Sequence, residues 1–250
     1  MADLLEVYGG QSVSDAKGWF EVSGLNEGLY RLEIRKTGYA MEIIAPLSVG
    51  SSADGQALEV LLDKESRITG KITGPSGEPV AGAVLVLCNG RGQPMLLAGT
   101  SRAPESDASG CYVIQAVKAG TYRVLAEAKG LARALSPAVS VPKDGAVEQD
   151  FSLGKEARIR VSVLAAGAPA EGADVTLLDS AGAEVIDWTA RKSMIQGMAP
   201  QATDKEGKYT LVRLAAGTYT VKVQISDGRT KSAACTVAAG GETALALEFD

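Results

Sequence analysis

The chain contains no histidine among its 250 residues. Histidine is the commonest metal ligand and the usual general base near neutral pH, so zinc hydrolase chemistry and the Ser/His/Asp or Cys/His nucleophile systems are excluded in their usual forms. No cluster of carboxylates stands out as a replacement. The sequence therefore predicts a protein that is not an enzyme and that uses no cofactor and no metal.

The sequence also lacks any block of like charge. The chain has 25 Lys and Arg against 30 Asp and Glu, and neither sign forms a block. Nucleic acids and anionic lipids require a basic stripe, so neither is an expected partner. No apolar run approaches the roughly 18 residues that a membrane-spanning helix needs. The first ten residues lack the charged start and apolar core of an export signal, so no export signal is expected within this sequence.

Cysteine is scarce: Cys88, Cys111 and Cys235 are the three, and none belongs to a CxxC pair. This count predicts no disulfide framework and no metal site. Cys88 and Cys111 both fall at predicted outward strand positions, which leaves a bridge between them open, and we favour two free thiols. Cys235 falls at an inward strand position, so we interpret it as a small buried hydrophobe.

The feature that is present is an internal repeat. Aromatic residues make up only 5% of the chain and glycine is frequent, with 29 residues, as expected for short strands joined by tight turns. Three segments superpose without gaps: SDAKGWFEVSGLNEGLYRLEI from Ser14, SDASGCYVIQAVKAGTYRVLA from Ser106 and TDKEGKYTLVRLAAGTYTVKV from Thr203. Their first aspartates lie 107 − 15 = 92 and 204 − 107 = 97 residues apart. A period of this size predicts that each copy has its own core.

The repeated motif has a physical reading. An aspartate followed three residues later by glycine predicts a tight turn, in which the carboxylate accepts backbone N–H groups and the glycine takes a positive φ. The residues that follow alternate apolar and polar, which predicts half-buried strands, and the Gly-x-Tyr between them predicts a hairpin. The aspartates are Asp15, Asp107 and Asp204. Calcium binding is the alternative, and we favour turn capping because no second carboxylate recurs at a fixed offset.

Further strands surround the motif. A Gly-x-Pro turn at GEPVAGAVLVL and GAPAEGADVTL precedes one strand and follows another, and a Gly-containing turn introduces a last strand. About seven strands and no helical segment are expected per complete copy, which is typical of a two-sheet sandwich. We therefore predict an all-β chain of three tandem seven-stranded β-sandwiches. The expected boundaries are 1–64, 65–155 and 156–250.

These motifs resemble a known family. IxGxIxGPSGEPVAGAxVxL followed by SDxxGxYxIxxVxAGTYRVxAxAKG is similar to the carboxypeptidase regulatory-like domain. The resemblance implies a transthyretin-like (prealbumin-like), Ig-like β-sandwich, usually found as an accompanying module outside the cytoplasm. It therefore implies an extracellular, cell-surface or periplasmic location. The metallopeptidase that gives the family its name needs histidine ligands, so its activity is not expected in this chain.

The first copy departs from this plan. ADLLEVYGG aligns with GAVLVLCNG of the second copy, so the opening strand of the first sandwich is absent. We favour the interpretation that the chain is a fragment of a longer repeat protein. The alternative is that a strand from a neighbouring chain fills the groove, so that self-association by strand addition builds a polymer. The linkers Asp63–Arg67 and Gly154–Arg158 are short, which predicts a semi-rigid rod.

Candidate partner-binding residues lie where the copies differ. Exposed Trp, Met and Arg are common at contact surfaces. Trp19 occupies an outward position, and a loop of the third copy contains the others: Trp188, Arg191, Lys192, Met194 and Met198. We expect a non-catalytic structural or adhesive stalk or spacer of a larger secreted or surface protein, with the other domains of that protein as partners. A carbohydrate- or protein-binding module that uses this loop and Trp19 is the alternative, and for Trp188 we favour a role as a lid on its own sandwich.

Overall fold

The chain is built from β-strands. The computed structural model covers residues 1–250 and describes 10–50, 57–95, 103–185 and 202–250. Every regular element within these ranges is a strand, which confirms the predicted all-β class. In the same ranges no helix has the length and apolar character that crossing a membrane would require.

The second copy forms two sheets. In the first sheet β3 is central, pairing antiparallel with β5 and parallel with β9 and β10. In the other sheet β6 pairs antiparallel with β4, β7 and β8. The bounds are β3 Ser66–Thr73, β4 Val84–Asn89, β5 Cys111–Val117, β6 Gly120–Glu127, β7 Ala134–Leu135, β8 Val139–Val141, β9 Ala146–Glu148 and β10 Phe151–Ser152.

One apolar core lies between these two sheets. Along β5 buried and exposed residues alternate, because successive side chains of a strand point to opposite faces. Both sheets contribute fully buried side chains to the same cluster, among them Ile68, Ile72, Leu85, Leu87, Ile114 and Val124. The second copy is therefore a β-sandwich with its own core.

The third copy repeats this architecture. β11 is central in one sheet, between antiparallel β14 and parallel β17, and the other sheet has the order β13, β15, β16. A separate core that includes Ile159, Leu177, Leu214 and Val221 lies between the two sheets. The bounds are β11 Ala157–Ala165, β12 Ala168–Pro169, β13 Asp174–Leu178, β14 Lys208–Leu214, β15 Gly217–Gln224, β16 Thr230–Val237 and β17 Glu242–Phe249.

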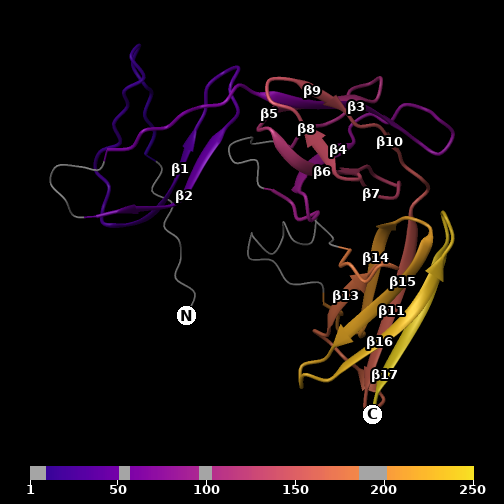
Figure 1. Cartoon of the computed structure of the whole chain (residues 1–250). Coiled ribbons are helices and arrows are strands. Elements are labelled where there is room, and N and C mark those ends of the chain that lie inside the picture. Colours follow the sequence, from indigo (N-terminus) through magenta and orange to yellow (C-terminus); the bar gives the residue numbers. More distant parts are fainter. Residues whose placement is uncertain (1–9, 51–56, 96–102, 186–201) are drawn as a thin grey trace.

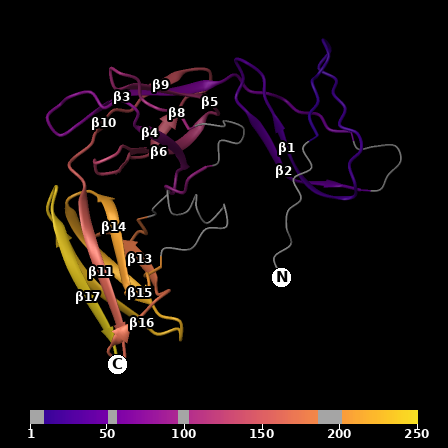
Figure 2. The same cartoon turned by 180° about the vertical axis from the view of Figure 1, so that it is seen from behind.

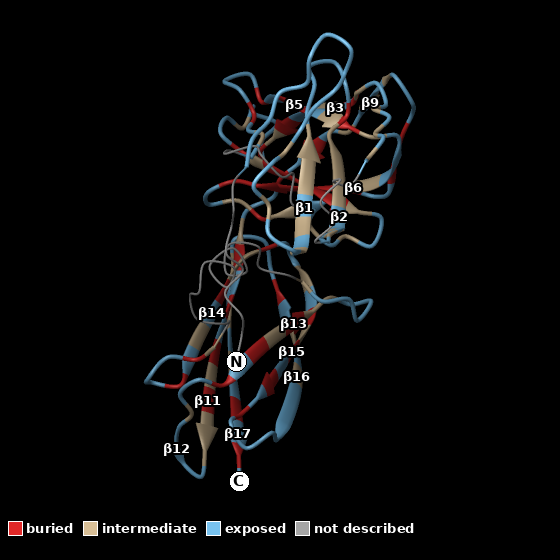
Figure 3. Ribbon diagram, turned by 90° about the vertical axis from the view of Figure 1, so that its left-hand side faces the viewer, coloured by how far each residue is buried: buried red, intermediate tan, exposed pale blue. Residues whose placement is uncertain are grey.

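The first copy is much less complete. Its described strands are β1 (Gly28–Ile34) and β2 (Glu42–Val49), which form a two-stranded antiparallel sheet. Within 10–50 and 57–65, Ala40 is the one fully buried residue. Figure 3 shows this contrast, because β1 and β2 are coloured intermediate or exposed while strands of the other copies contain buried residues.

The predicted hairpin within the repeated motif is wrong. β5 pairs with β3, whereas β6 pairs with β4, so the connection between them crosses from one sheet to the other. The third copy crosses in the same way between β14 and β15, and there the Tyr219 hydroxyl donates to the Ala215 carbonyl at 2.9 Å. In the first copy the Tyr30 hydroxyl donates to the Asn26 carbonyl at 2.8 Å. Such a tyrosine corner is typical of sandwiches with Greek-key connections.

The copies follow one another along a bent line. In Figures 1 and 2 the second copy lies between the first and the third, and the third turns away from it toward the C-terminus. The arrangement is extended, as the short linkers predict, but the expected rod is bent at the second copy. The contacts at the two junctions between copies therefore determine this bend.

Candidate functional site: the junctions between copies

The first linker is part of the preceding copy. Ala40 N–H donates to the Asp63 carbonyl at 2.8 Å, and Glu65 N–H donates to the Gly38 carbonyl at 3.1 Å. These bonds flank an antiparallel bridge between Tyr39 and Lys64. Because these peptide groups are paired, the linker is held against the preceding copy by an isolated bridge and two hydrogen bonds.

The same linker continues into the following copy. Arg67 N–H donates to the Gly145 carbonyl at 2.9 Å, and the buried Ser66 hydroxyl donates to the Pro142 carbonyl at 2.6 Å. Ser66 and Arg67 already belong to β3, the central strand of the second copy. The chain therefore passes from one copy to the next without an unpaired residue that could serve as a hinge.

The second junction is built in the same way. Ala132 N–H donates to the Gly154 carbonyl at 2.9 Å, beside an antiparallel bridge between Leu131 and Lys155. On the other side of the linker, Arg158 N–H donates to the Gly241 carbonyl at 3.0 Å. These contacts occupy the positions that correspond to those at the first junction. The repeat therefore includes the connection between copies as well as the copies themselves.

Ion pairs reinforce the first junction. Lys64 Nζ lies 3.2 Å from Asp144 Oδ2, and Lys143 Nζ lies 3.0 Å from Asp63 Oδ1. The linker and the facing loop thus each contribute one lysine and one aspartate to the two ion pairs. All four side chains are more than half exposed, so each pair contributes at most about 1 kcal/mol. Lys118 also pairs with Glu42 of the first copy.

The second junction contains a buried charge cluster, which we call the junction clasp: Glu127, Arg133 and Arg213. The Glu127 carboxylate of the second copy lies 3.8 Å from Arg133 Nε and 3.6 Å from Arg213 Nη1 of the third. The side chains of Glu127 and Arg133 are each only 9% exposed. Because charge buried in this way depends strongly on its partners, the clasp ties the two copies together.

Arg133 also reaches the third copy through hydrogen bonds. Its backbone N–H donates to the Arg213 carbonyl at 2.9 Å, and its Nη2 donates to the Val212 carbonyl at 3.1 Å. Arg213 has a positive φ of 59°, as Ala116 does at the equivalent bend of the second copy, with 58°. The repeat gives no signal for this clasp, because Glu127, Arg133 and Arg213 do not recur at the equivalent positions of the first junction.

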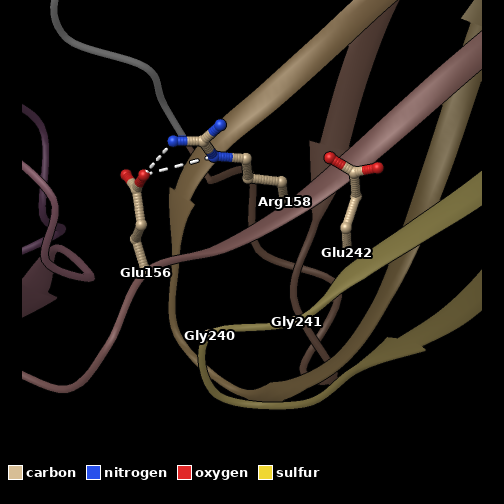
Figure 4. A pocket seen from close by; sticks show the side chains of 5 residues that line it. All are labelled: Glu156, Arg158, Gly240, Gly241 and Glu242. Atoms are coloured by element: carbon tan, nitrogen blue, oxygen red, sulfur yellow. Dashed lines mark hydrogen bonds and ion pairs between the residues drawn. The ribbon is translucent and has the colours of Figure 1, made fainter.

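A shallow hollow of about 270 Å³ also lies at the second junction (Figure 4). Arg158 forms an ion pair and a hydrogen bond with Glu156, and the hydrogen bond raises the pKa of the Arg158 guanidinium. Glu242, on the other side, pairs with Arg160 at 3.0 Å. The charged side chains in the hollow are therefore engaged with neighbouring residues of the chain. It is lined by Glu156, Arg158, Gly240, Gly241 and Glu242.

The repeated aspartates cap turns, as predicted. Oδ1 of Asp107 accepts the backbone N–H groups of Ser109 and Cys111, each at 2.9 Å. The Ser109 hydroxyl donates to the same oxygen at 2.7 Å, which is the main reason why the pKa of Asp107 is lowered. Asp15 and Asp204 accept the corresponding two N–H groups in their own copies. No group of three or more potential metal ligands occurs among the described residues.

Of the candidate partner-binding residues, only Trp19 lies within the described residues. Trp19 is 76% exposed, so its indole is presented to solvent as expected, and its backbone N–H donates to Asp15 Oδ1. The predicted contact at Trp19 stays a prediction. The remaining candidates lie outside the described residues: Trp188, Arg191, Lys192, Met194 and Met198.

All three thiols are free, and their environments differ. Cys111 is exposed, Cys235 is half-buried against the core of the third copy, and Cys88 is fully buried. Cys88 points away from the main core of the second copy and packs in a second small cluster with Val86 and Leu125. Burial raises the pKa of the Cys88 thiol to about 11 and also raises that of Cys235.

Comparison with known families confirms the class of the second copy. Residues 67–154 match the model of the carboxypeptidase regulatory-like domain. The second copy is therefore a domain of this family, as its motifs indicated. No curated protein matches the chain significantly.

Several solved structures are similar to the chain. The Bacillus anthracis TIE protein is 16% identical with a TM-score of 0.32, and the match covers 96% of this chain and 44% of that one. BcpA, the major pilin subunit of Bacillus cereus, is 10% identical over 74% of this chain and 99% of that one, with a TM-score of 0.30. The shaft pilin spaA from Lactobacillus rhamnosus GG is 12% identical over 75% and 98%, with a TM-score of 0.32. This chain thus spans less than half of the TIE protein structure, and likenesses at this level assign no function.

Proposed function

We propose that the chain is a non-catalytic structural spacer that holds other parts of a larger protein at a defined separation. The observation that carries this proposal is the repeated junction. At both junctions the linker is hydrogen-bonded to the preceding and to the following copy, at Ala40 and Arg67 in one case and at Ala132 and Arg158 in the other. A linker without free residues transmits position and orientation, as a spacer must.

The domain division belongs to the same proposal. We place boundaries at the linkers, so that residues 1–64, 65–155 and 156–250 each form one unit. The separate cores of the second and third copies support this division, because residues of one core cluster do not appear in the other. The family of the second copy supports a location outside the cytoplasm, at the cell surface or in the periplasm.

Small-angle scattering of the whole chain tests the spacer function. The native chain is expected to give one extended, bent shape with a narrow distribution of dimensions. Inserting a ten-residue Gly-Ser segment between Gly154 and Lys155 breaks the second junction and is expected to broaden that distribution. The same insertion after Ser76, in an exposed turn, is the matched control and is expected to change little. If the native chain were as heterogeneous as the first variant, the spacer function would be wrong.

A second candidate function is assembly by strand addition at the first copy. It is favoured by the low burial of that copy, in which Ala40 alone is fully buried within 10–50 and 57–65. Apolar strands that are not covered by their own chain are sites where another strand adds. Sedimentation equilibrium tests self-association directly, because a polymer has a mass that grows with concentration, whereas a monomer has one that does not.

A further inference from the structure

In each complete copy the strand that opens the sandwich lies beside the strand that closes it. β3 pairs with β9 and β10, β11 pairs with β17, and all of these pairings are parallel. β3 begins at Ser66 within the first linker, and β10 ends shortly before Gly154, where the second linker starts. Ser152 at the end of β10 lies opposite Thr73 at the end of β3, so the two linkers leave the second copy at opposite ends of β3. Figure 1 shows the same for the third copy, because the C-terminus, which follows β17, lies at the end away from the second copy.

This arrangement determines how a copy responds to tension along the chain. When the two linkers are pulled apart, β3 is drawn along β10 in the direction of both strands, and the hydrogen bonds between them are loaded together. When two paired strands are instead separated from one end, their hydrogen bonds are loaded one after another. Forced unfolding is governed by the barrier to unfolding, so the first geometry, in which several bonds must break in a single step, withstands the larger force.

In the third copy the parallel ladder is uninterrupted. β17 pairs with every residue of β11 from Arg158 to Ala165. Hydrogen bonds close both ends: the Arg158 N–H donates to the Gly241 carbonyl at 3.0 Å, and the Ala166 N–H donates to the Phe249 carbonyl at 2.8 Å. The first of these bonds is also the contact that holds the second linker to the third copy. Tension that enters through this linker therefore reaches the first rung of the ladder directly.

In the second copy the ladder is interrupted. β9 pairs with three residues of β3, and β10 pairs with two others. Between these two segments the Lys71 N–H donates to Oδ1 of Asp150 at 2.7 Å, so a side chain supplies the acceptor. An added Cβ at Gly70 would lie only 2.0 Å from the Gln149 carbonyl oxygen, so glycine permits the close approach of the strands at this point. The ladder of the second copy is therefore shorter than that of the third and depends on one carboxylate.

We propose that the second and third copies are load-bearing units, in which the paired opening and closing strands resist tension along the chain. We call each pairing a shear clamp: β3 with β9 and β10 in the second copy, and β11 with β17 in the third. The third copy has the stronger clamp because its ladder is longer and continuous. Resistance to tension goes beyond the spacer function, since parts can be held at a defined separation without bearing a load. The clamp depends on pairing within one copy, whereas the spacer function depends on the junctions between copies.

Single-molecule force spectroscopy on the whole chain tests the clamp of the third copy. Handles attached at Lys155→Cys and Asp250→Cys draw β11 and β17 along one another, whereas handles at Lys155→Cys and Ala239→Cys separate the same strands from one end. All three positions are exposed, and the native cysteines are replaced by alanine in both variants, so the two differ in the direction of pulling relative to the strands. The first pair of handles is expected to require the higher unfolding force. Equal forces for the two pairs would overturn the proposal.

The second copy provides a test at a single residue. Handles at Lys64→Cys and Lys155→Cys isolate this copy, which is expected to unfold at a lower force than the third. Asp150→Ala removes the acceptor of the Lys71 N–H and is expected to make unfolding under the same load about fivefold faster, as the loss of one hydrogen bond predicts. Asp150→Asn keeps an acceptor oxygen and is the matched control, which should retain the native rate. A second copy that outlasts the third under equal load, or a native rate for Asp150→Ala, would overturn the clamp as the load-bearing element.

Discussion

Replacing Glu127 by alanine should loosen the second junction. The substitution removes the carboxylate between the guanidinium groups of Arg133 and Arg213 and leaves the two positive charges facing each other. Removing one partner of a buried ion pair typically costs 3–5 kcal/mol, and the distances of 3.6 and 3.8 Å place the clasp at the low end, near about 3 kcal/mol. Because 1.4 kcal/mol is tenfold, the equilibrium between docked and undocked copies should shift by about 100-fold.

Pulsed electron paramagnetic resonance measures this shift. One spin label is placed on Cys111 of the second copy and the other on an engineered Ser226→Cys of the third, both exposed, with the other two cysteines replaced by alanine. The native junction should give a narrow distance distribution, and Glu127→Ala should broaden it. Glu148→Ala, which removes an exposed carboxylate, is the control and should leave it unchanged. Equal widths for the native chain and Glu127→Ala would refute the role assigned to the clasp.

Three further predictions concern the second copy and are tested by denaturant unfolding, the third also by thiol modification. Ser106→Ala should destabilise it by about 1–3 kcal/mol, because the buried hydroxyl accepts one backbone N–H and donates to one carbonyl, whereas Ser106→Thr should be tolerated. Gly110→Ala should cost more than Gly77→Ala although both have φ near +80°, since an added Cβ would lie 2.5 Å from a backbone oxygen only at Gly110; equal losses would contradict this. Cys88 should resist a thiol reagent that modifies Cys111. Because burial raises the Cys88 pKa, folding should be more favourable below about pH 9 than at higher pH, and this contribution to the free energy of unfolding should be lost as the pH rises through about 11. Cys88→Ala should abolish this pH dependence.

The local turns could be predicted because their chemistry is local. An aspartate followed three residues later by glycine specifies its own hydrogen bonds, so Asp107 accepts the N–H groups of Ser109 and Cys111 without help from distant segments. Alternation of apolar residues likewise identifies the buried face of β5. These features depend on the order of neighbouring residues and on the fixed geometry of a strand.

The sheet partners could not be predicted in the same way. The motif suggested a hairpin, and the structure places β5 and β6 in different sheets. Alternation is the same for a strand that pairs with its neighbour and for one that crosses to the opposite sheet, because both bury one face. A residue with positive φ lies at the crossing in both complete copies, Ala116 in the second and Arg213 in the third, and in the third copy the Tyr219 corner accompanies it.

The junction clasp was also hidden from sequence reasoning. Glu127 and Arg213 are 86 residues apart, since 213 − 127 = 86, and each looks like an ordinary solvated charge within its own strand. Their proximity depends on how one sandwich docks against the next.

The amino-acid sequence by itself determined the all-β class, the repeat of about 95 residues, the capped turns and the family of the second copy. Only the tertiary structure decided which strands share a sheet and how the linkers are held. The reason is that hydrogen bonds within a turn and the period of a strand are properties of adjacent residues. Pairing, docking and burial depend instead on which distant segments meet.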